Sequence, residues 1–250
     1  MSPEPFGLQE GAILVADAHY APWNPPFLDF LRALRGGKIR TPQLILMGDI
    51  FDLLFGDIDA THPFNREAVD LLNLLSEAME ILYLEGNHDF RLRRLFPRIR
   101  VVPRTRQPLV GTFKELKVAL SHGDTRMGLG YELYTALIRN GVILKILNRI
   151  DQWGGGFIVK RLTTMMMGKR HCHPIEGFEA LIRNRYPQGR SVSADVIIEG
   201  HYHQNTSFEL GAKQYYFNLG AFACNERYYA VQSSQNRMVL KEVFLSKEPQ

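Results

Sequence analysis

The chain has 250 residues, 45% of them hydrophobic, and its 30 Lys and Arg against 26 Asp and Glu give a formal net charge of +4. This composition excludes a disordered or fibrous chain and allows one large domain or two small ones. The sequence has no window of about 18 uncharged apolar residues, and its N-terminus has no basic segment followed by an apolar core. We therefore expect a protein that is neither exported nor membrane-spanning.

Five short aliphatic runs are each followed by a cluster of polar residues. They cover residues 12–16, 43–47, 81–84, 117–120 and 194–198. Continuous aliphatic runs of this length are typical of strands buried on both faces. Apolar spacing predicts helices over 26–34 and 65–79, between the first three runs. Further strands are predicted after the last run, at 206–210, 214–219, 228–232 and 238–245. We expect a layered α/β chain.

The interval 126–186 interrupts the strand series with a basic, helix-rich segment. It holds ten Lys and Arg and four Asp and Glu, a balance of +6, while the remainder carries −2. Apolar spacing predicts helices over 131–150 and 157–167, and the second ends in three consecutive methionines, Met165 to Met167. Methionine fills adaptable apolar surfaces, so the segment is either an ordinary packed insertion or a lid over an apolar ligand.

A second basic stretch, 91–106, has seven arginines and no acidic residue. It indicates a solvated basic face, a site for an anionic substrate or contact with an acidic membrane surface. The two cysteines, Cys172 and Cys224, are too few and too far apart in sequence to suggest a disulfide framework. We therefore expect a reducing compartment, the cytoplasm, and a structural role for Cys224.

The polar clusters gather metal-binding residue types at the carboxyl ends of the predicted strands, where open α/β sheets place their ligands. The candidates are Asp17, His19, Asp49, Asn87, His88, His122, His201 and His203. Five of the eight histidines of the chain are in this set. Imidazole and carboxylate without thiolate suit Mn²⁺, Fe²⁺ or Zn²⁺, and there are ligands enough for two ions. The D-x-H and H-x-H spacings would place alternate side chains on the same side of an extended segment.

Five motifs in order resemble the calcineurin-like metallophosphoesterases. They are D-x-H at 17–19, G-D at 48–49, G-N-H-D at 86–89, H-G-D at 122–124 and G-H-x-H at 200–203. The resemblance implies a four-layer αββα sandwich in which 1–250 form a single domain and 126–186 form a helical lid within it. It also implies two divalent ions, with Mn²⁺ as the first expectation and Fe²⁺ or Zn²⁺ as alternatives.

The resemblance also implies a role for each candidate. Asp49 would bridge the ions, because one carboxylate offers an oxygen to each of them. One ion would also be held by Asp17, His19 and His203, and the other by Asn87, His122 and His201. Two ions about 3.5 to 4 Å apart stabilise the attacking and leaving oxygens of a displacement at phosphorus. His88 would be a catalytic non-ligand that donates a proton, and Asp89 and Asp124 would support the ligands.

Three stretches resemble one branch of that family, the UDP-2,3-diacylglucosamine hydrolases of lipid A biosynthesis. They are GNHDF at 86–90, HGDT at 122–125 and NLGAF at 218–222. In that branch the insertion encloses acyl chains, and hydrolysis of the pyrophosphate gives UMP and lipid X. The resemblance implies a lipid-linked nucleotide substrate, peripheral attachment to the anionic inner membrane from the cytoplasm, and substrate contacts from Asn87, His88, Lys169 and Arg170. The chain departs from the branch at His88, where the branch has arginine, and at Gly128 and Gly130, where it has acidic residues.

Other functions remain open on the sequence. A phosphoesterase for a soluble substrate, such as a dinucleoside polyphosphate or a phosphoprotein, would have a small or polar lid. A nuclease would draw on the arginine stretch 91–106, but that stretch has only Phe96 as an interleaved aromatic, so no nucleic-acid partner is expected. A non-catalytic scaffold on the same fold would lack metal ligands. His171, Cys172 and His173 have no supporting ligands and do not indicate a separate metal site. The oligomeric state stays open.

Overall fold

The computed structural model describes residues 6–125, 127–168, 172–187, 192–211, 214–235 and 237–246. Its strands are β1 Phe6–Gly7, β2 Ile13–Val15, β3 Gln43–Leu46, β4 Leu54–Phe55, β5 Glu80–Leu84, β6 Asp89–Phe90, β7 Arg100–Val102, β8 Leu109–Phe113, β9 Leu116–Ser121, β10 Val196–Glu199, β11 Thr206–Gly211, β12 Gln214–Asn218, β13 Arg227–Ser234 and β14 Arg237–Phe244. Its α-helices are α1 Pro26–Arg35, α2 Arg66–Leu75, α3 Leu129–Ile138, α4 Gly141–Trp153, α5 Phe157–Met167, α6 Phe178–Arg185 and α7 Phe222–Asn225. Short 3₁₀ turns lie at η1 Asp59–Thr61, η2 Pro63–Asn65, η3 Leu92–Arg94 and η4 Arg104–Arg106.

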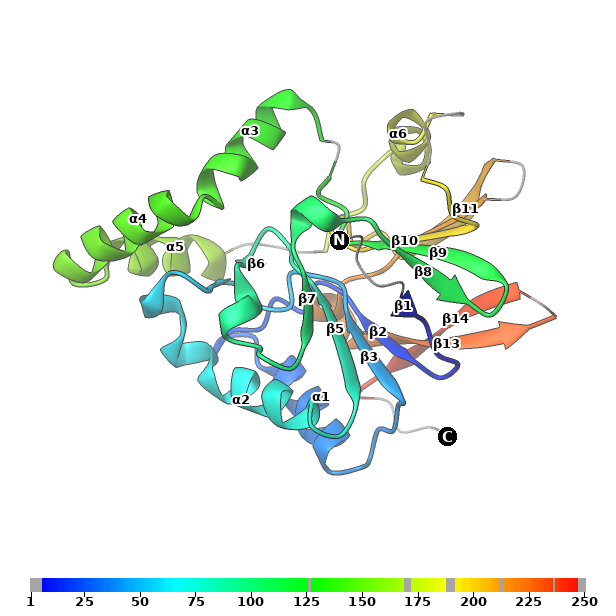
Figure 1. Cartoon of the computed structure of the whole chain (residues 1–250), viewed down its shortest axis with the longest axis horizontal. Helices are drawn as coiled ribbons and strands as arrows, with labels where there is room; N and C mark the ends of the chain where they lie inside the picture. Colours follow the sequence, from blue (N-terminus) through cyan, green and yellow to red (C-terminus); the bar gives the residue numbers. More distant parts are fainter. Residues whose placement is uncertain are drawn as a thin grey trace.

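Two six-stranded sheets form the centre of the molecule (Figure 1). One has the order β14-β13-β2-β3-β5-β7 and the other the order β1-β8-β9-β10-β12-β11. Strands β2, β3, β5 and β7 are parallel, and β10 runs parallel to both β9 and β12. All the predicted strands are confirmed. Strands β2, β3, β5, β9 and β10 lie inside the sheets, where burial on both faces needs continuous aliphatic runs.

Helices cover the outer faces of both sheets, which gives four layers. Helices α1 and α2 pack on the β2-β3-β5 sheet, and α6 packs on the β9-β10-β12 sheet. A separate cluster of aliphatic side chains fills the space between the sheets, including Leu14, Ile45, Leu120 and Ile198. The predicted αββα fold class is therefore confirmed.

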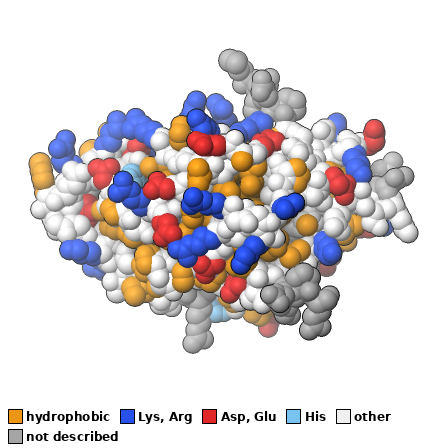
Figure 2. All heavy atoms as spheres, turned by 90° about the horizontal axis from the view of Figure 1, so that it is seen from below, with side chains coloured by type: hydrophobic (Ala, Val, Ile, Leu, Met, Phe, Trp, Pro, Cys, Tyr) orange, Lys and Arg blue, Asp and Glu red, His pale blue; other side chains and the backbone are white. Residues whose placement is uncertain are grey.

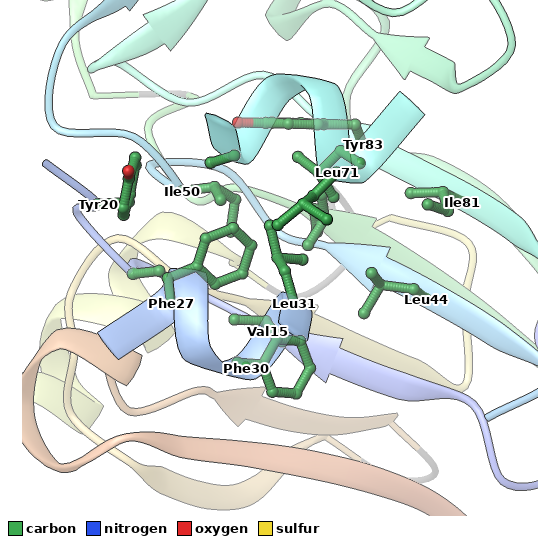
Figure 3. Packing of buried hydrophobic residues seen from close by; sticks show 14 of the residues in the cluster. Val15, Tyr20, Phe27, Phe30, Leu31, Leu44, Ile50, Leu71, Ile81 and Tyr83 are labelled. Carbon is green, nitrogen blue, oxygen red and sulfur yellow. The ribbon is translucent and has the colours of Figure 1, made fainter. Parts of the chain in front are cut away.

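The α1 layer shows why the local sequence folds as it does (Figure 3). Pro26 begins the helix, where its missing N–H costs no hydrogen bond. Phe27, Phe30 and Leu31 point from one face of α1 toward the sheet, where they meet Val15 and Leu44. The predicted helix 26–34 is confirmed, whereas α2 ends at Leu75, four residues before the predicted boundary.

The interval between β9 and β10 divides into two parts. Helices α3, α4 and α5 project from the sheets as an arm, while α6 lies over the β10 and β11 side of the molecule (Figure 1). The prediction of one helix over 131–150 is wrong, because Asn140 accepts hydrogen bonds from the N–H groups of Val142 and Ile143 and so starts a new helix. The predicted helix 157–167 is confirmed. In the described part of the chain, no helix is long and apolar enough to cross a membrane.

The face seen from below relative to Figure 1 carries a mixture of positive, negative and hydrophobic side chains (Figure 2). On α1 and α2, exposed basic side chains pair with acidic ones. Arg32 pairs with Asp29 and Glu67, and Arg66 lies 3.9 Å from Asp70. Exposed pairs of this sort contribute little stability. The positive charge of the chain is therefore not gathered on this face.

Candidate metal centre

Five loops at the ends of strands from both sheets meet at one edge of the sandwich. Asp17 and His19 follow β2, Asp49 follows β3, and Asn87 and His88 follow β5. From the other sheet, His122 follows β9, and His201 and His203 follow β10. Because β2, β3 and β5 are parallel, as are β9 and β10, the loops after these strands lie side by side.

The predicted residues come together in groups with the spacing of metal ligands. In each group the ligand atoms lie within 4.8 Å of one another, and the groups are Asp17 with His19 and His203, Asp49 with His122 and His201, and His19 with Asp52 and His88. His203 Nε2 lies 3.2 Å from Asp17 Oδ1, and His122 Nε2 lies 3.5 Å from Asp49 Oδ2. Asn87 Oδ1 lies 3.2 Å from His122 Nε2. These nitrogen and oxygen atoms fit borderline divalent cations.

Five of the candidate ligands have a left-handed backbone. The φ angle is 51° at Asp17, 44° at His19, 51° at Asp49, 65° at His201 and 60° at His203. The expectation of extended D-x-H and H-x-H segments is therefore wrong, and the side chains converge from tight turns. Positive φ is uncommon outside glycine, and such strain persists mainly at functional sites.

At two of the motif glycines, another loop approaches too closely to leave room for a side chain. A Cβ at Gly200 would lie 2.6 Å from Asp17 Oδ2, and a Cβ at Gly86 would overlap the carboxylate of Asp49. Any side chain at these positions would therefore displace a candidate ligand. The glycines of G-N-H-D and G-H-x-H are thus set by packing between loops that are distant in sequence.

The buried Asp49 carboxylate lies among histidine side chains that favour its charged form. Burial favours protonation of Asp49, but His122, His88 and His19 outweigh it and hold its pKa well below the usual range. Burial lowers the pKa of His122, but Asp49 raises it more strongly, to about 10. Burial and the neighbouring His122 lower the pKa of His201 to about 3. A buried anion thus faces imidazole nitrogens, the arrangement in which a cation can replace a proton.

Asp89 connects two of the loops through buried hydrogen bonds. Its carboxylate accepts hydrogen bonds from the backbone N–H groups of Asp49 at 3.0 Å and Gly86 at 2.9 Å. It also accepts from the N–H groups of Ile50 at 2.6 Å and Phe51 at 3.2 Å, and from the Tyr83 hydroxyl at 2.6 Å. The loops that carry Asp49 and Asn87 therefore share one buried anchor.

Asp52 belongs to the site although the sequence interpretation missed it. Its Oδ1 lies 3.3 Å from His19 Nδ1, and its backbone carbonyl accepts a hydrogen bond from His88 Nδ1 at 2.8 Å. A carboxylate on the second nitrogen of a ligating histidine fixes its orientation. The signal was present in the sequence as an aspartate three residues after Asp49.

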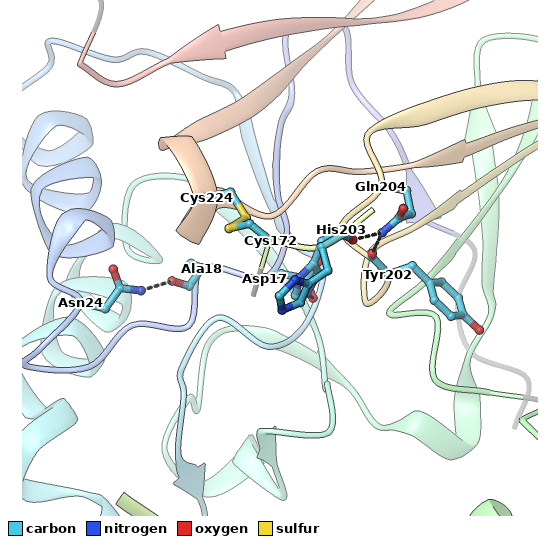
Figure 4. Close-up of a disulfide and its surroundings, with 9 residues drawn as sticks. Asp17, Ala18, Asn24, Cys172, Tyr202, His203, Gln204 and Cys224 are labelled. Carbon is cyan, nitrogen blue, oxygen red and sulfur yellow. Dashed lines mark hydrogen bonds and ion pairs between the residues drawn. A yellow bond between two sulfur atoms is a disulfide. The ribbon is translucent and has the colours of Figure 1, made fainter. Parts of the chain in front are cut away.

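A disulfide lies beside the site and corrects the interpretation of the cysteines (Figure 4). Cys172 and Cys224 are bonded, with their Cα atoms 5.8 Å apart, and the Ala223 N–H donates to the Asp17 carbonyl at 3.2 Å. Sequence separation misled the prediction because both segments return to the same edge of the sandwich. The disulfide also removes the basis for expecting a reducing compartment, where such bonds are rare. The bond also removes the Cys172 thiolate as a metal ligand. Lys169 and Arg170, the predicted phosphate contacts, lie outside the described residues.

A separate hollow of about 1100 Å³ lies along β7 and is lined by much of the arginine-rich stretch. Its lining includes Arg91, Arg93, Arg94, Arg100, Arg104 and Arg106. Some of this charge is compensated, since Arg91 and Arg94 lie near Asp57. None of the candidate metal ligands lines this hollow.

Comparison with known proteins places the chain in a family. The sequence profile of the calcineurin-like phosphoesterases matches residues 12–205. The UDP-2,3-diacylglucosamine hydrolase of Salmonella paratyphi B is 25% identical over 212 residues, which cover 80% of this chain and 85% of that protein. The hydrolase of the same name from Aromatoleum aromaticum is 35% identical over 118 residues, covering 45% of this chain and 46% of that protein.

Some solved structures bear a distant resemblance to this one. Yfce, a phosphoesterase from E. coli, is 12% identical with a TM-score of 0.45, and the match covers 94% of this chain and 99% of Yfce. A dimetal phosphatase from Danio rerio is 14% identical with a TM-score of 0.45, covering 92% of this chain and 95% of that one. The profile match over most of the sequence, with histidine and aspartate groups that could hold metal ions, carries the assignment. The chain belongs to the calcineurin-like phosphoesterase family.

Proposed function

We propose that this phosphoesterase hydrolyses the pyrophosphate of UDP-2,3-diacylglucosamine to UMP and lipid X. The observation that carries the proposal is the apolar arm beside the metal centre. Many of its large hydrophobic side chains are exposed: Leu129, Leu133, Tyr134, Leu137, Val142, Ile146, Ile150, Trp153, Phe157, Met165 and Met167. These side chains lie on the three successive helices α3, α4 and α5. Large exposed apolar patches on soluble proteins usually mark a site for a ligand, a partner or a membrane.

The base of the arm packs against the segment that follows the G-N-H-D motif. Phe90, which follows Asp89, packs in one buried cluster with Leu144 of α4 and Val159 of α5. A substrate with its acyl chains on the arm would therefore have its phosphates near the histidine groups. A soluble dinucleoside polyphosphate would leave this apolar surface without a use.

For the metal centre we propose two divalent ions, Mn²⁺ first among the candidates, bridged by Asp49. Asp17, His19 and His203 would complete one site, and Asn87, His122 and His201 the other. When bound, such ions polarise the phosphate and supply a nucleophile at neutral pH. Asp52 and Asp89 would keep the ligands in place through their hydrogen bonds to His19 and to the backbone of Asp49.

His88 has the geometry of a proton donor. Its Nδ1 must carry a hydrogen, because its partner, the Asp52 carbonyl, can only accept. Nε2 is then the atom that can take up and deliver a proton, and the ring stands edge-on to His19 with centroids 4.9 Å apart. We assign His88 to protonation of the leaving group or to donation to the phosphate.

We also propose peripheral attachment to the cytoplasmic face of the inner membrane, on the resemblance to the lipid A branch and not on the cysteines. Interfacial binding requires apolar and basic surface together. The interval 126–186 offers both, with a charge balance of +6 and the exposed side chains of the arm. Lys169 and Arg170 remain our candidates for contacts to the substrate phosphates.

The test is a substrate panel with purified, Mn²⁺-loaded protein. UDP-2,3-diacylglucosamine should be hydrolysed to UMP, while UDP-N-acetylglucosamine and a dinucleoside polyphosphate should react at least about 100-fold more slowly in kcat/KM, because they lack the binding energy of the acyl chains. EDTA-treated protein is the control for metal dependence. Preference for the dinucleoside polyphosphate would refute the proposed substrate while keeping the phosphoesterase assignment.

A further inference from the structure

A cluster of charged side chains, buried except for Glu132, joins the arm to the loops of the proposed metal ligands. Arg104 lies in η4, Asp124 follows His122 by two residues, Glu132 lies in the first turn of α3, and Arg139 directly follows the last residue of α3. The side chain of Asp124 is fully buried, and those of Arg104 and Arg139 are 9% and 12% exposed. The cluster therefore connects both ends of the first arm helix to the body of the protein.

The contacts at the start of α3 run through Arg104. Its Nη1 and Nη2 donate to the two carboxylate oxygens of Glu132 at 2.8 and 2.7 Å. Its Nε donates to Asp124 Oδ2 at 3.0 Å, and Nη2 also donates to the Asp124 carbonyl at 2.7 Å. A guanidinium that makes paired bonds of this kind fixes direction as well as distance.

The contacts at the end of α3 run through Arg139. Its Nη2 donates to the Gly86 carbonyl at 2.7 Å and to Asp124 Oδ2 at 3.2 Å, and its guanidinium lies 5.0 Å from the centre of the Phe90 ring. Gly86 immediately precedes Asn87 in the chain. One arm residue therefore touches the loops of two proposed ligands of the same ion.

Stability alone gives a poor account of this arrangement. Arg139 Nε and Nη1, and Asp124 Oδ1, are buried and have no hydrogen-bond partner among the described residues. Burying polar atoms without partners is unfavourable, and an apolar side chain at this place would avoid that cost. Other contacts of the arm base among the described residues include a small apolar cluster and exposed hydrogen bonds from Asn148 and Gln152 to Asp59.

We propose that Arg139 is a positioning residue that fixes the arm relative to the Asn87 and His122 loops. The arm carries the proposed acyl-binding surface. The hydrogen bonds of Arg139 to Gly86 and Asp124 would therefore keep the acyl chains at a set distance from the reacting phosphate. A shift of about 1 Å in a bound substrate can reduce rate about 100-fold. The effect on the substrate rests on the proposed function, whereas the restraint that Arg139 places on the arm does not.

The first measurement is hydrogen exchange of the Mn²⁺-loaded protein, followed by mass spectrometry. Arg139→Gln should raise exchange across 129–153, while Arg66→Gln, which removes an exposed ion pair on α2, should leave it unchanged. Arg139→Lys keeps the charge and one donor for Gly86 or Asp124, and it should fall between wild type and Arg139→Gln. Unchanged exchange in the arm of both Arg139 variants would overturn the proposal.

The second measurement separates positioning from damage to the metal centre. In Arg139→Gln, kcat/KM for UDP-2,3-diacylglucosamine should fall about 10- to 100-fold, while kcat/KM for bis(p-nitrophenyl) phosphate, which has no acyl chains, should change less than about threefold. Equal losses on both substrates would overturn the proposal. If Arg139→Gln does not fold, Arg139→Lys carries the same comparison. If the wild type hydrolyses only the aryl diester, the proposed function is wrong, and the exchange measurement alone decides the role of Arg139.

Discussion

Asp89→Asn should destabilise the protein strongly although it changes a single atom of the side chain. The carboxylate of Asp89 accepts five hydrogen bonds, four of them from backbone N–H groups. Oδ1 accepts from the N–H groups of Asp49 and Gly86, and Oδ2 accepts from those of Ile50 and Phe51. An asparagine has only one acceptor oxygen, so either orientation leaves two backbone donors facing an NH₂ group.

The magnitude follows from the count of lost acceptors. A buried donor without a partner costs about 1 to 3 kcal/mol, so two of them should lower the free energy of unfolding by about 2 to 6 kcal/mol. Urea unfolding at fixed Mn²⁺ measures this as a lower midpoint at constant slope. Asp70→Asn is the matched control, because its partner Arg66 is 3.9 Å away on an exposed helix face, and it should cost less than about 0.5 kcal/mol. A loss below about 1 kcal/mol in Asp89→Asn would refute the idea that this carboxylate is the shared anchor of the two loops.

Four further outcomes are expected. Asp49→Ala removes the proposed bridging ligand from both ions and should reduce kcat about a thousandfold or more; wild-type activity with wild-type metal content would show that the bridge is misassigned. His88→Ala should keep the metals but lower kcat about 10²- to 10⁴-fold, whereas His88→Arg should retain much of the activity on UDP-2,3-diacylglucosamine and lose it on alkyl phosphate monoesters; equal failure of both variants on both substrates would argue against the lipid A branch. Replacing the methionines at 165–167 with serine should raise KM for long acyl chains and spare a short-chain substrate; equal loss on both would indicate folding damage instead. Cys224→Ser opens a loop of 52 residues to Cys172 and should lower the free energy of unfolding by about 2 to 4 kcal/mol, measured by urea unfolding; no change with a dithiol reductant in the wild type would mean that the bond does not form in solution.

The sequence by itself determined the strands that lead into the candidate site and the chemistry at their ends. Both depend on local information: an aliphatic run such as 43–47 can be buried on two faces only as an inner strand, and a glycine followed by Asp49 marks where that strand stops. The nitrogen and oxygen ligand types at positions 17, 49 and 122 followed from the same motifs. Because these signals repeat in order along the chain, their sum indicated the fold class and the candidate site together.

The tertiary structure decided what depends on contacts between segments that are distant in sequence. Asp52 is placed against His19 only once the β2 and β3 loops lie side by side, and Cys172 meets Cys224 only because the chain after the arm returns to α7. Arg139 gave no sequence signal, since an arginine near a helix end is ordinary there, and its role depends on the Gly86 carbonyl 53 residues away. Local patterns set which face of an element is apolar, but partners across the fold are selected by the packing of all elements at once, and no short stretch of sequence contains that information.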